Sequence, residues 1–284
     1  MSTYSTVKNK RRIVIKVGTS TLTHASGQLN IRVVEELVKV ISDIKNSGYE
    51  IVLVTSGAIG LGAARLGMSS KPKDTPTKQA CAAIGQCELM NMYDKLFNEY
   101  NIIAAQVLLT KYVLTDERKI NVENCIETII AKGAIPIVNE NDVVAIDELE
   151  LEVGENDSLA AMVACLIKAD LLIILSDIDG MYDKDPRTNP DAKLISRIEK
   201  ITDDIRHAAG DAGTALGTGG MATKLHAAQI VMQSGIDMLI INGDRPQNLY
   251  DIFGGRWFWR EICGSAFWVG VRFLSACVCR FAFI

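Results

Sequence analysis

Short β-branched runs alternate along this chain with longer segments of helical period, and this alternation constrains the fold more than any other feature. Residues 12–17 read RIVIKV and predict a strand, and apolar residues then recur at helical spacing over 31–44, with Asn30 as N-cap and Gly48 as the stop. Strands that are apolar on both faces and separated by helices indicate an α/β fold, with a mainly parallel sheet covered on both sides. Ligands of such sheets bind beyond the carboxyl ends of the strands.

The same pattern continues to residue 253. Further helices are expected over 77–100, 116–132, 158–168 and 225–234. Further strands are expected over 51–54, 102–109, 134–138, 171–175 and 238–241. The least regular stretches are 67–76, 177–197 and 210–220. Unusual polar residues gather directly after the strands, so we expect the functional site at the carboxyl edge of the sheet.

Charge and cysteine content argue against several classes of protein. The net charge of −4 argues against a nucleic-acid partner, because nucleic-acid binders usually carry a clear basic surplus. Residues 1–12 are polar and contain no apolar signal region, and the seven cysteines include no CxxC pair and no zinc spacing with histidine. Scattered thiols without a secretion signal predict a cytoplasmic protein with reduced cysteines, and we expect no metal ligated by the protein alone.

Residues 254–284 differ in composition from the rest of the chain. They hold all three tryptophans, five of the seven phenylalanines and three cysteines, without a clean period. Arg272 and Arg280 interrupt the apolar segment, so no run reaches the roughly 18 residues that a membrane span needs. We therefore expect no membrane helix, and a domain over 1–253 followed by an atypical apolar tail over 254–284. A non-native or frame-shifted end is the simpler explanation of that tail.

Two lysines accompany glycine-rich turns. Lys16 ends the first strand in KVGTS, where it can reach an anionic ligand; a surface lysine at a strand end is the alternative. Lys224 closes GTGGMATK at the start of a helix, which suits a phosphate cradle with a mobile cation or, alternatively, a flexible loop before an ordinary helix. The P-loop pattern is absent from the chain.

Polar clusters lie at other element boundaries. Ser56 belongs to TSGAIGLG, where a strand turns into a helix and exposed amides can bind an anion or simply be capped. The amides and carboxylates of VNEND (138–142) and GENDS (154–158) suit an α-amino group, although N-capping by residues 156–158 is an equally physical reading. The acidic run over 175–187 fits a nucleotide-contact loop, because the glutamate that would close a calcium loop is not in place.

Two lysines on separate glycine-rich elements, with carboxylates between them, indicate phosphoryl transfer, which needs mainly positioning and charge neutralisation. A carboxylate acceptor has a pKa of about 4.3 and is already ionised at neutral pH, so it needs no general base. The three histidines form no cluster in the sequence, and the absence of an obvious base is consistent with such an acceptor.

Six motifs in register resemble the glutamate 5-kinases of the amino acid kinase family over residues 10–253: KVGTS, TSGAIGLG, VNEND, GENDSLAA, LSDIDGMYDKDPR and GTGGMATK. The resemblance implies a three-layer αβα sandwich with a mainly parallel central sheet. It implies ATP-dependent phosphorylation of the γ-carboxylate of L-glutamate to L-glutamyl 5-phosphate, the first step of proline biosynthesis. It also implies Mg²⁺ carried with the nucleotide, feedback inhibition by proline, and a homo-oligomer, either a dimer or a tetramer.

The resemblance assigns site residues motif by motif. Lys16 and Lys224 would contact the transferring phosphate, and Asp157 would orient the lysines or a metal-bound water. The residues that would hold glutamate are Ser56, Asp142 and Asn156. The residues that would line the ATP site are Lys16, Ser176, Asp177, Thr218, Gly219, Gly220, Met221, Ala222, Thr223 and Lys224.

Two departures from the family pattern are visible. Glu155 stands where the family usually has Asp, which keeps the charge but adds a methylene. Family members also continue past residue 253 into a last strand, and many then carry a PUA domain; we recognise neither over 254–284. Three alternatives stay open: a kinase of the same fold acting on another small acid or phosphate, an inactive nucleotide- or amino-acid-binding regulator, and a protein tethered to a membrane by its tail.

Overall fold

The computed structural model describes residues 11–24, 27–70, 72–115, 117–145, 156–184, 186, 189–211, 220–254 and 266–269. Its strands are β1 (Arg12–Val17), β2 (Glu50–Val54), β3 (Ala104–Leu109), β4 (Ile135–Glu140), β5 (Leu171–Ser176), β6 (Met181–Tyr182), β7 (Leu194–Ile195), β8 (Arg197–Ile198), β9 (Asp237–Asn242) and β10 (Ala266–Val269). Its helices are α2 (Thr19–Leu22), α3 (Ile31–Asn46), α4 (Ala58–Arg65), α5 (Thr75–Asn98), α6 (Lys111–Thr115), α7 (Lys119–Ala131), α9 (Asn156–Leu166), α10 (Asp203–Asp211), α11 (Met221–Gln233) and α12 (Asn248–Gly254).

Within the described residues, eight strands form one sheet in the order β3-β4-β2-β1-β5-β9-β10-β8. Neighbouring strands from β3 to β9 are parallel, whereas β10 is antiparallel to β9 and parallel to β8. The chain moves outward from β1 through β2 on one side, and β5 and β9 then extend the sheet on the other side. The strand order therefore reverses between β1 and β5, which is where open sheets of this kind bind their ligands.

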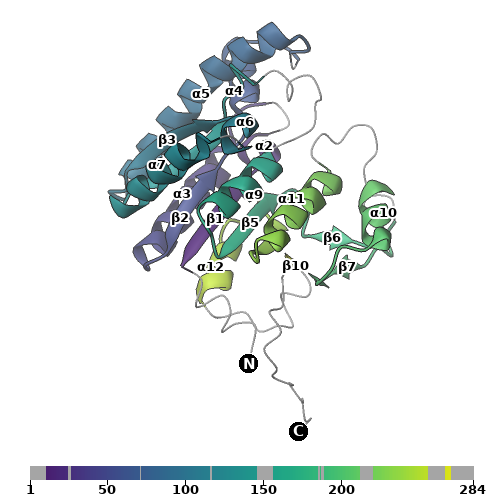
Figure 1. Cartoon of the computed structure of the whole chain (residues 1–284). Helices are drawn as coiled ribbons and strands as arrows, with labels where there is room; N and C mark the ends of the chain where they lie inside the picture. The colour runs from purple at the N-terminus through teal and green to yellow at the C-terminus, as the bar shows by residue number, and fades with distance from the viewer. Residues whose placement is uncertain are drawn as a thin grey trace.

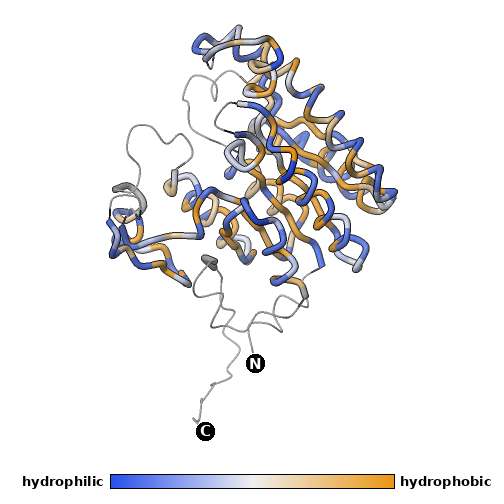
Figure 2. Tube along the Cα trace, turned by 180° about the vertical axis from the view of Figure 1, so that it is seen from behind, coloured by the Kyte–Doolittle hydropathy of each residue, from blue (hydrophilic) through white to orange (hydrophobic). Residues whose placement is uncertain are grey.

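Helices cover both faces of the sheet and give the molecule three layers (Figure 1). The helices α3, α5 and α12 enclose one hydrophobic cluster, and α7, α9 and α11 enclose the other. Strand β1 contributes to both clusters, because Ile13 and Ile15 face one layer while Val14 faces the other. Figure 2 shows the hydrophobic positions gathered along the central strands and the inner faces of the helices. The three-layer αβα sandwich expected from the sequence is confirmed.

Local sequence signals explain several boundaries. The side chain of Asn30 accepts a hydrogen bond from the Val33 backbone N–H at 3.4 Å, which caps α3 as expected. Gly48 follows the helix with a φ of +98°, a conformation that favours glycine and ends the helix. The predicted strands at 12–17, 51–54, 102–109, 134–138, 171–175 and 238–241 correspond to β1, β2, β3, β4, β5 and β9.

The structure differs from the expected pattern in several places, and α10, α12 and β8 were not among the expected elements. The irregular stretch over 177–197 contains an antiparallel pairing of β6 with β7, whose two-residue strands are too short to show a period. The helix expected over 116–132 begins at Lys119, after the separate helix α6. The segment over 254–284, where we expected no final strand, contains β10, which satisfies the edge of β9. Among the described helices, none is both long and apolar enough to cross a membrane.

Candidate active site

The carboxyl ends of the central strands place a set of polar side chains at one edge of the sheet. Lys16 lies near the end of β1, Ser56 follows β2, Asn139 lies near the end of β4, and Ser176 ends β5. These strands are adjacent and parallel, so their ends meet where the strand order reverses. The N-terminus of α9 brings Asn156 and Asp157 to the same edge, as the contacts below show.

Two lysines share one buried carboxylate at this edge. Lys16 Nζ lies 2.7 Å from Asp157 Oδ1, and Lys224 Nζ lies 3.2 Å from Asp157 Oδ2. All three side chains are buried, with residue exposures of 8% for Lys16, 6% for Lys224 and 1% for Asp157. The three groups together carry a net positive charge in a site of low dielectric constant. Two ammonium groups held on one carboxylate are suited to binding an anion, because charge-assisted hydrogen bonds from ammonium groups to an anion are strong.

The electrostatics of this cluster follow from its burial. Burial lowers the pKa of Lys16, and the neighbouring charge of Lys224 lowers it further, while Asp157 partly offsets both effects. Burial alone would raise the pKa of Asp157, but the two lysines outweigh it, so the pKa of Asp157 lies below its ordinary value. Asp157 is therefore ionised at neutral pH and is unsuited to act as a proton acceptor.

The start of α11 contributes a second contact to the same carboxylate. Thr223 Oγ1 lies 3.1 Å from Asp157 Oδ2 and 2.8 Å from the backbone oxygen of Gly220. Gly220 is extended and precedes the first residue of the helix, Met221. The Thr223 N–H donates to the Gly220 backbone oxygen at 3.1 Å, while the N–H groups of Met221 and Ala222 lie before the first acceptor that a helix can offer them. Backbone N–H groups at such a position, beside a lysine, are a common phosphate-binding arrangement.

A chain of amide hydrogen bonds lies beside the lysines. Asn156 Nδ2 lies 2.7 Å from the Thr55 backbone oxygen, 2.7 Å from Ser56 Oγ and 3.2 Å from Asn139 Oδ1. The structure thus brings Ser56 and Asn156 together, as the sequence predicted. Asp142 lies in the turn that follows β4, three residues beyond Asn139.

The end of β5 supplies the remaining predicted side chains. Ser176 Oγ donates to Asp177 Oδ1 at 3.1 Å, and the charge of Asp177 acts on Lys16. The backbone oxygen of Ser176 accepts from the Gly243 N–H at 2.8 Å, which ties the end of β5 to the turn after β9. Ser176 and Asp177 therefore lie on the same edge as the lysine pair.

Some sequence expectations change in the structure, and others fall outside it. The helix α9 begins at Asn156, and the side chains of Asn156 and Asp157 bond to Thr55, Ser56 and the lysines, so N-capping does not account for these two residues. Glu155, Thr218 and Gly219 lie outside the described residues. Gly220 and Met221 are at the start of α11 together with Ala222, which is exposed.

Sequence reasoning missed several residues of this site. Asn139 lies within the VNEND motif but had no role assigned, and it is 1% exposed and bonded to Asn156. Gln86 and Tyr93, both on α5, bond to Asn139 and Thr55. Neither residue carries a distinctive sequence signal, because polar and apolar residues are mixed along α5.

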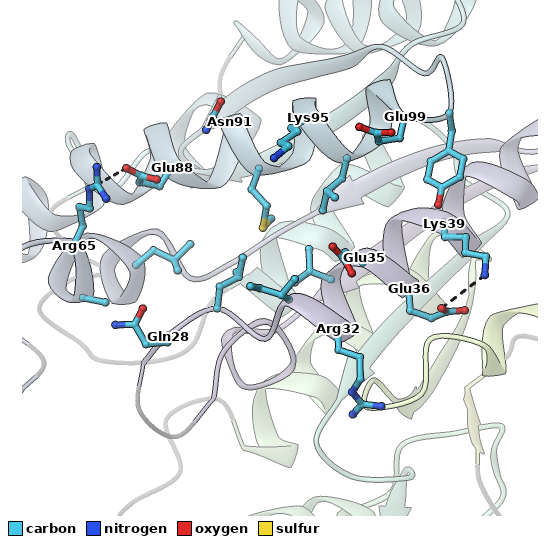
Figure 3. A pocket seen from close by; sticks show the side chains of 18 residues that line it. Gln28, Arg32, Glu35, Glu36, Lys39, Arg65, Glu88, Asn91, Lys95 and Glu99 are labelled. Atoms are coloured by element: carbon cyan, nitrogen blue, oxygen red, sulfur yellow. Dashed lines mark ion pairs between the residues drawn. The ribbon is translucent and has the colours of Figure 1, made fainter.

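A groove of about 1100 Å³ lies elsewhere, between α3, α4 and α5 (Figure 3). Acidic and basic side chains alternate around it, including the ion pairs of Arg65 with Glu88 at 3.2 Å and of Lys39 with Glu36 at 4.0 Å. None of the predicted site residues lines this groove. Because its charges are of both signs, it offers no concentrated positive field for a nucleotide.

Comparisons with known proteins agree with the fold. A family model described as the amino acid kinase family matches residues 11–242. A glutamate 5-kinase from Clostridium perfringens is 54% identical over 252 residues, covering 88% of this chain and 94% of that relative. A glutamate 5-kinase from Caldanaerobacter subterraneus is 52% identical over 245 residues, covering 86% of this chain and 65% of the longer relative.

Solved structures with lower identity share the fold. The carbamate kinase from Giardia lamblia bound to AMP-PNP aligns with a TM-score of 0.62 at 16% identity, covering 93% of this chain and all of that chain (100%). The UMP kinase from Ureaplasma parvum aligns with a TM-score of 0.58 at 20% identity, covering 92% of this chain and 99% of that chain. At this level of identity the likeness concerns the fold alone.

Proposed function

This chain belongs to the amino acid kinase family, and from that premise we propose that it transfers the γ-phosphoryl group of ATP to the γ-carboxylate of L-glutamate. The product is L-glutamyl 5-phosphate, which enters proline biosynthesis. The observation that carries the proposal is the buried Lys16–Asp157–Lys224 cluster beside the hydrogen-bonded pair of Ser56 and Asn156. The glutamate 5-kinase relatives, about half identical over most of this chain, support the choice of glutamate.

The reaction requires no proton transfer. A γ-carboxylate oxygen of glutamate attacks the γ-phosphorus, the bond to the bridging oxygen breaks, and ADP leaves with that electron pair. Lys16 and Lys224 neutralise the charge that spreads over the transferring phosphoryl oxygens and the leaving group. Asp157 keeps the two ammonium groups at one place, because each of its oxygens pairs with one of them.

The nucleotide lies along the ends of β5 and α11 in this proposal. Ser176, Asp177 and the segment from Thr218 to Lys224 line it, with the first N–H groups of α11 directed to phosphate oxygens. Mg²⁺ enters with ATP and supplies further charge neutralisation on its phosphates. The exposed carboxylate of Asp177 is suited to accept a hydrogen bond from a water bound to that ion. Both oxygens of Asp157, in contrast, already face lysine ammonium groups.

Glutamate occupies the neighbouring polar site made by Ser56, Asp142 and Asn156. Asp142 is assigned to the α-ammonium group, because a carboxylate pairs well with a cation. We further propose that residues 1–253 form the kinase domain, to whose sheet β10 adds a strand beside β9. We also propose that the protein is a cytoplasmic homo-oligomer inhibited by proline, as the resemblance implies.

Hydroxamate formation tests the activity. Glutamate, ATP, Mg²⁺ and hydroxylamine are incubated with the protein, and an acyl phosphate is trapped as the hydroxamate. We expect glutamate-dependent hydroxamate together with ADP release. ADP release with another small acid in a substrate panel, and none with glutamate, would assign a different acceptor. Nucleotide binding without ADP release from any acid would indicate a regulator instead.

A further inference from the structure

One backbone carbonyl fixes the direction of a partly buried chain of side-chain amides at this site. The Thr55 oxygen can only accept hydrogen bonds, and Asn156 Nδ2 lies 2.7 Å from it. The amide of Asn156 must therefore present its nitrogen to Thr55, and the same nitrogen faces Asn139 Oδ1 at 3.2 Å. Asn139 must in turn present its oxygen to Asn156, because two amide nitrogens facing each other would both be donors.

The chain continues from Asn139 into α5 and β3. Asn139 Nδ2 donates to Gln86 Oε1 at 2.8 Å, and Gln86 Nε2 donates to Gln106 Oε1 at 3.3 Å. Asn139 is 1% exposed, so no bulk water is available to replace the acceptor that Gln86 provides. Gln86 is half-buried and Gln106 is exposed, so the chain leads from the buried site to the surface.

A second residue of α5, two turns beyond Gln86, also bonds to this site. Tyr93 OH lies 2.9 Å from Thr55 Oγ1, and Tyr93 is fully buried. Gln86 and Tyr93 are seven residues apart and so lie on one face of the helix. One helix face thus contacts both the side chain of Thr55, whose backbone oxygen orients Asn156, and the amide of Asn139 next to it.

The direction of this chain determines what Asn156 can offer a ligand. Its Nδ2 has two hydrogens and three acceptors within reach, all of them in the protein. The polar atom that is left is Oδ1, which can only accept. The two carboxylates of glutamate also only accept, so the α-ammonium is the group of glutamate that can bond to Asn156 Oδ1.

We propose that Gln86 is a positioning residue for the amino-acid substrate, acting through Asn139 to hold Asn156 with its oxygen toward the α-ammonium. This inference rests on the proposed glutamate kinase activity. It predicts that loss of the hydrogen-bond acceptor at residue 86 weakens binding of the α-ammonium group, measured by the KM for glutamate, more than it slows phosphoryl transfer, measured by kcat. Gln86 itself contacts neither nucleotide nor glutamate in this account.

The test compares Gln86→Met, which keeps the length and helix propensity but loses the acceptor, with Gln86→Glu, which keeps an acceptor for Asn139. Steady-state kinetics are measured with L-glutamate and with glutarate, which lacks the ammonium. For Gln86→Met we expect the KM for glutamate to rise about tenfold, roughly the effect of losing one neutral hydrogen bond. The KM for ATP and kcat should change little, and the preference for glutamate over glutarate should fall.

Two further variants complete the comparison. Gln86→Glu should keep a KM for glutamate close to that of the unmodified protein, because exposed Gln106 can turn its amide to donate. Asn91→Leu, on the exposed side of the same helix (Figure 3), is the matched control and should change neither KM. If Gln86→Met does not fold, Gln86→Lys replaces it. The lysine ammonium can only donate and would face another donor, Asn139 Nδ2, so we expect an equal or larger rise in the KM for glutamate.

The proposal fails if the non-acceptor variant leaves the KM for glutamate and the glutamate preference unchanged. It fails equally if the KM values for glutamate and ATP rise together, or if Gln86→Glu behaves like Gln86→Met. These outcomes require an active unmodified protein. Absence of glutamate-dependent hydroxamate from the unmodified protein would instead overturn the proposed function, and the proposal with it.

Discussion

Lys16 and Lys224 come from opposite ends of the kinase domain and bind the two oxygens of one carboxylate, that of Asp157, at 2.7 and 3.2 Å. This arrangement holds two ammonium groups close together in spite of their mutual repulsion. It provides the preorganised positive charge that phosphoryl transfer requires, at the edge where ligands of parallel sheets bind.

Removing either lysine should affect chemistry more than binding. Lys224→Ala and Lys16→Ala are each expected to lower turnover by about 10²–10³, the usual effect of losing one preorganised charge donor. Coupled ADP release measures turnover, and Lys95→Ala, an exposed lysine on α5, is the control. Unchanged turnover in either site variant would contradict its assigned role.

Asp157→Asn should destabilise the protein as well as inactivate it. The substitution removes the carboxylate that pairs with two buried lysines, and breaking a buried pair in this way costs about 3–5 kcal/mol. Urea unfolding of the nucleotide-free protein measures the free energy of unfolding. A variant as stable as the original would show that the carboxylate is not the partner of both lysines.

The difference in the free energy of unfolding between the original protein and Asp157→Asn should also depend on pH. The folded-state pKa of Asp157 lies below the ordinary value of 3.8, so its ionised form stabilises the folded protein. That stabilisation is complete above the unfolded pKa and is lost as the pH falls through the folded value. The stability difference between the original protein and Asp157→Asn should therefore be constant near neutral pH and shrink below about pH 4. A difference that grew on acidification would have the wrong sign.

Asp142→Ala tests the placement of the amino-acid site. Loss of the carboxylate proposed to bind the α-ammonium should raise the KM for glutamate by about tenfold or more, because a charged pair is lost, and leave the KM for ATP nearly unchanged. Initial rates with each substrate varied in turn give the two constants. Equal increases in both would place Asp142 outside the glutamate site.

Gly85→Ala tests how α5 supports the turn that carries Ser56. A Cβ at Gly85 would lie 1.8 Å from the backbone oxygen of Ala58, the first residue of α4. Alanine normally stabilises a helix by about 0.5–1 kcal/mol relative to glycine, but here the two backbones would have to separate. We expect a clear loss of stability in urea unfolding. A gain in stability would show that the two helices do not pack so closely.

Much of the fold is predictable because the residues that determine it act locally. Buried parallel strands appear as apolar runs, as in β1 and β5, and Asn30 and Gly48 mark the two ends of α3 by their own chemistry. The β6–β7 pairing and β10 escape prediction, since strands of two to four residues carry no measurable period.

The site is predictable in part. Lys16, Ser56, Asn156 and Lys224 are found because each belongs to a short motif at an element boundary. The resemblance assigns Asp157 to orienting the lysines or a metal-bound water. That each of its oxygens pairs with a different lysine depends on how α9 and α11 pack, which no local spacing encodes. Gln86 and Tyr93 reach the carboxyl edge of the sheet from within a long helix, where a single polar side chain has an ordinary appearance in the sequence.

A crystal structure with glutamate, Mg²⁺ and a non-hydrolysable ATP analogue tests the central claim most directly. We expect the ammonium groups of Lys16 and Lys224 within hydrogen-bond distance, about 3 Å, of oxygens on the γ-phosphate or its leaving bridge. The γ-carboxylate of glutamate should face that phosphate. A triphosphate bound away from both ammonium groups would contradict the account.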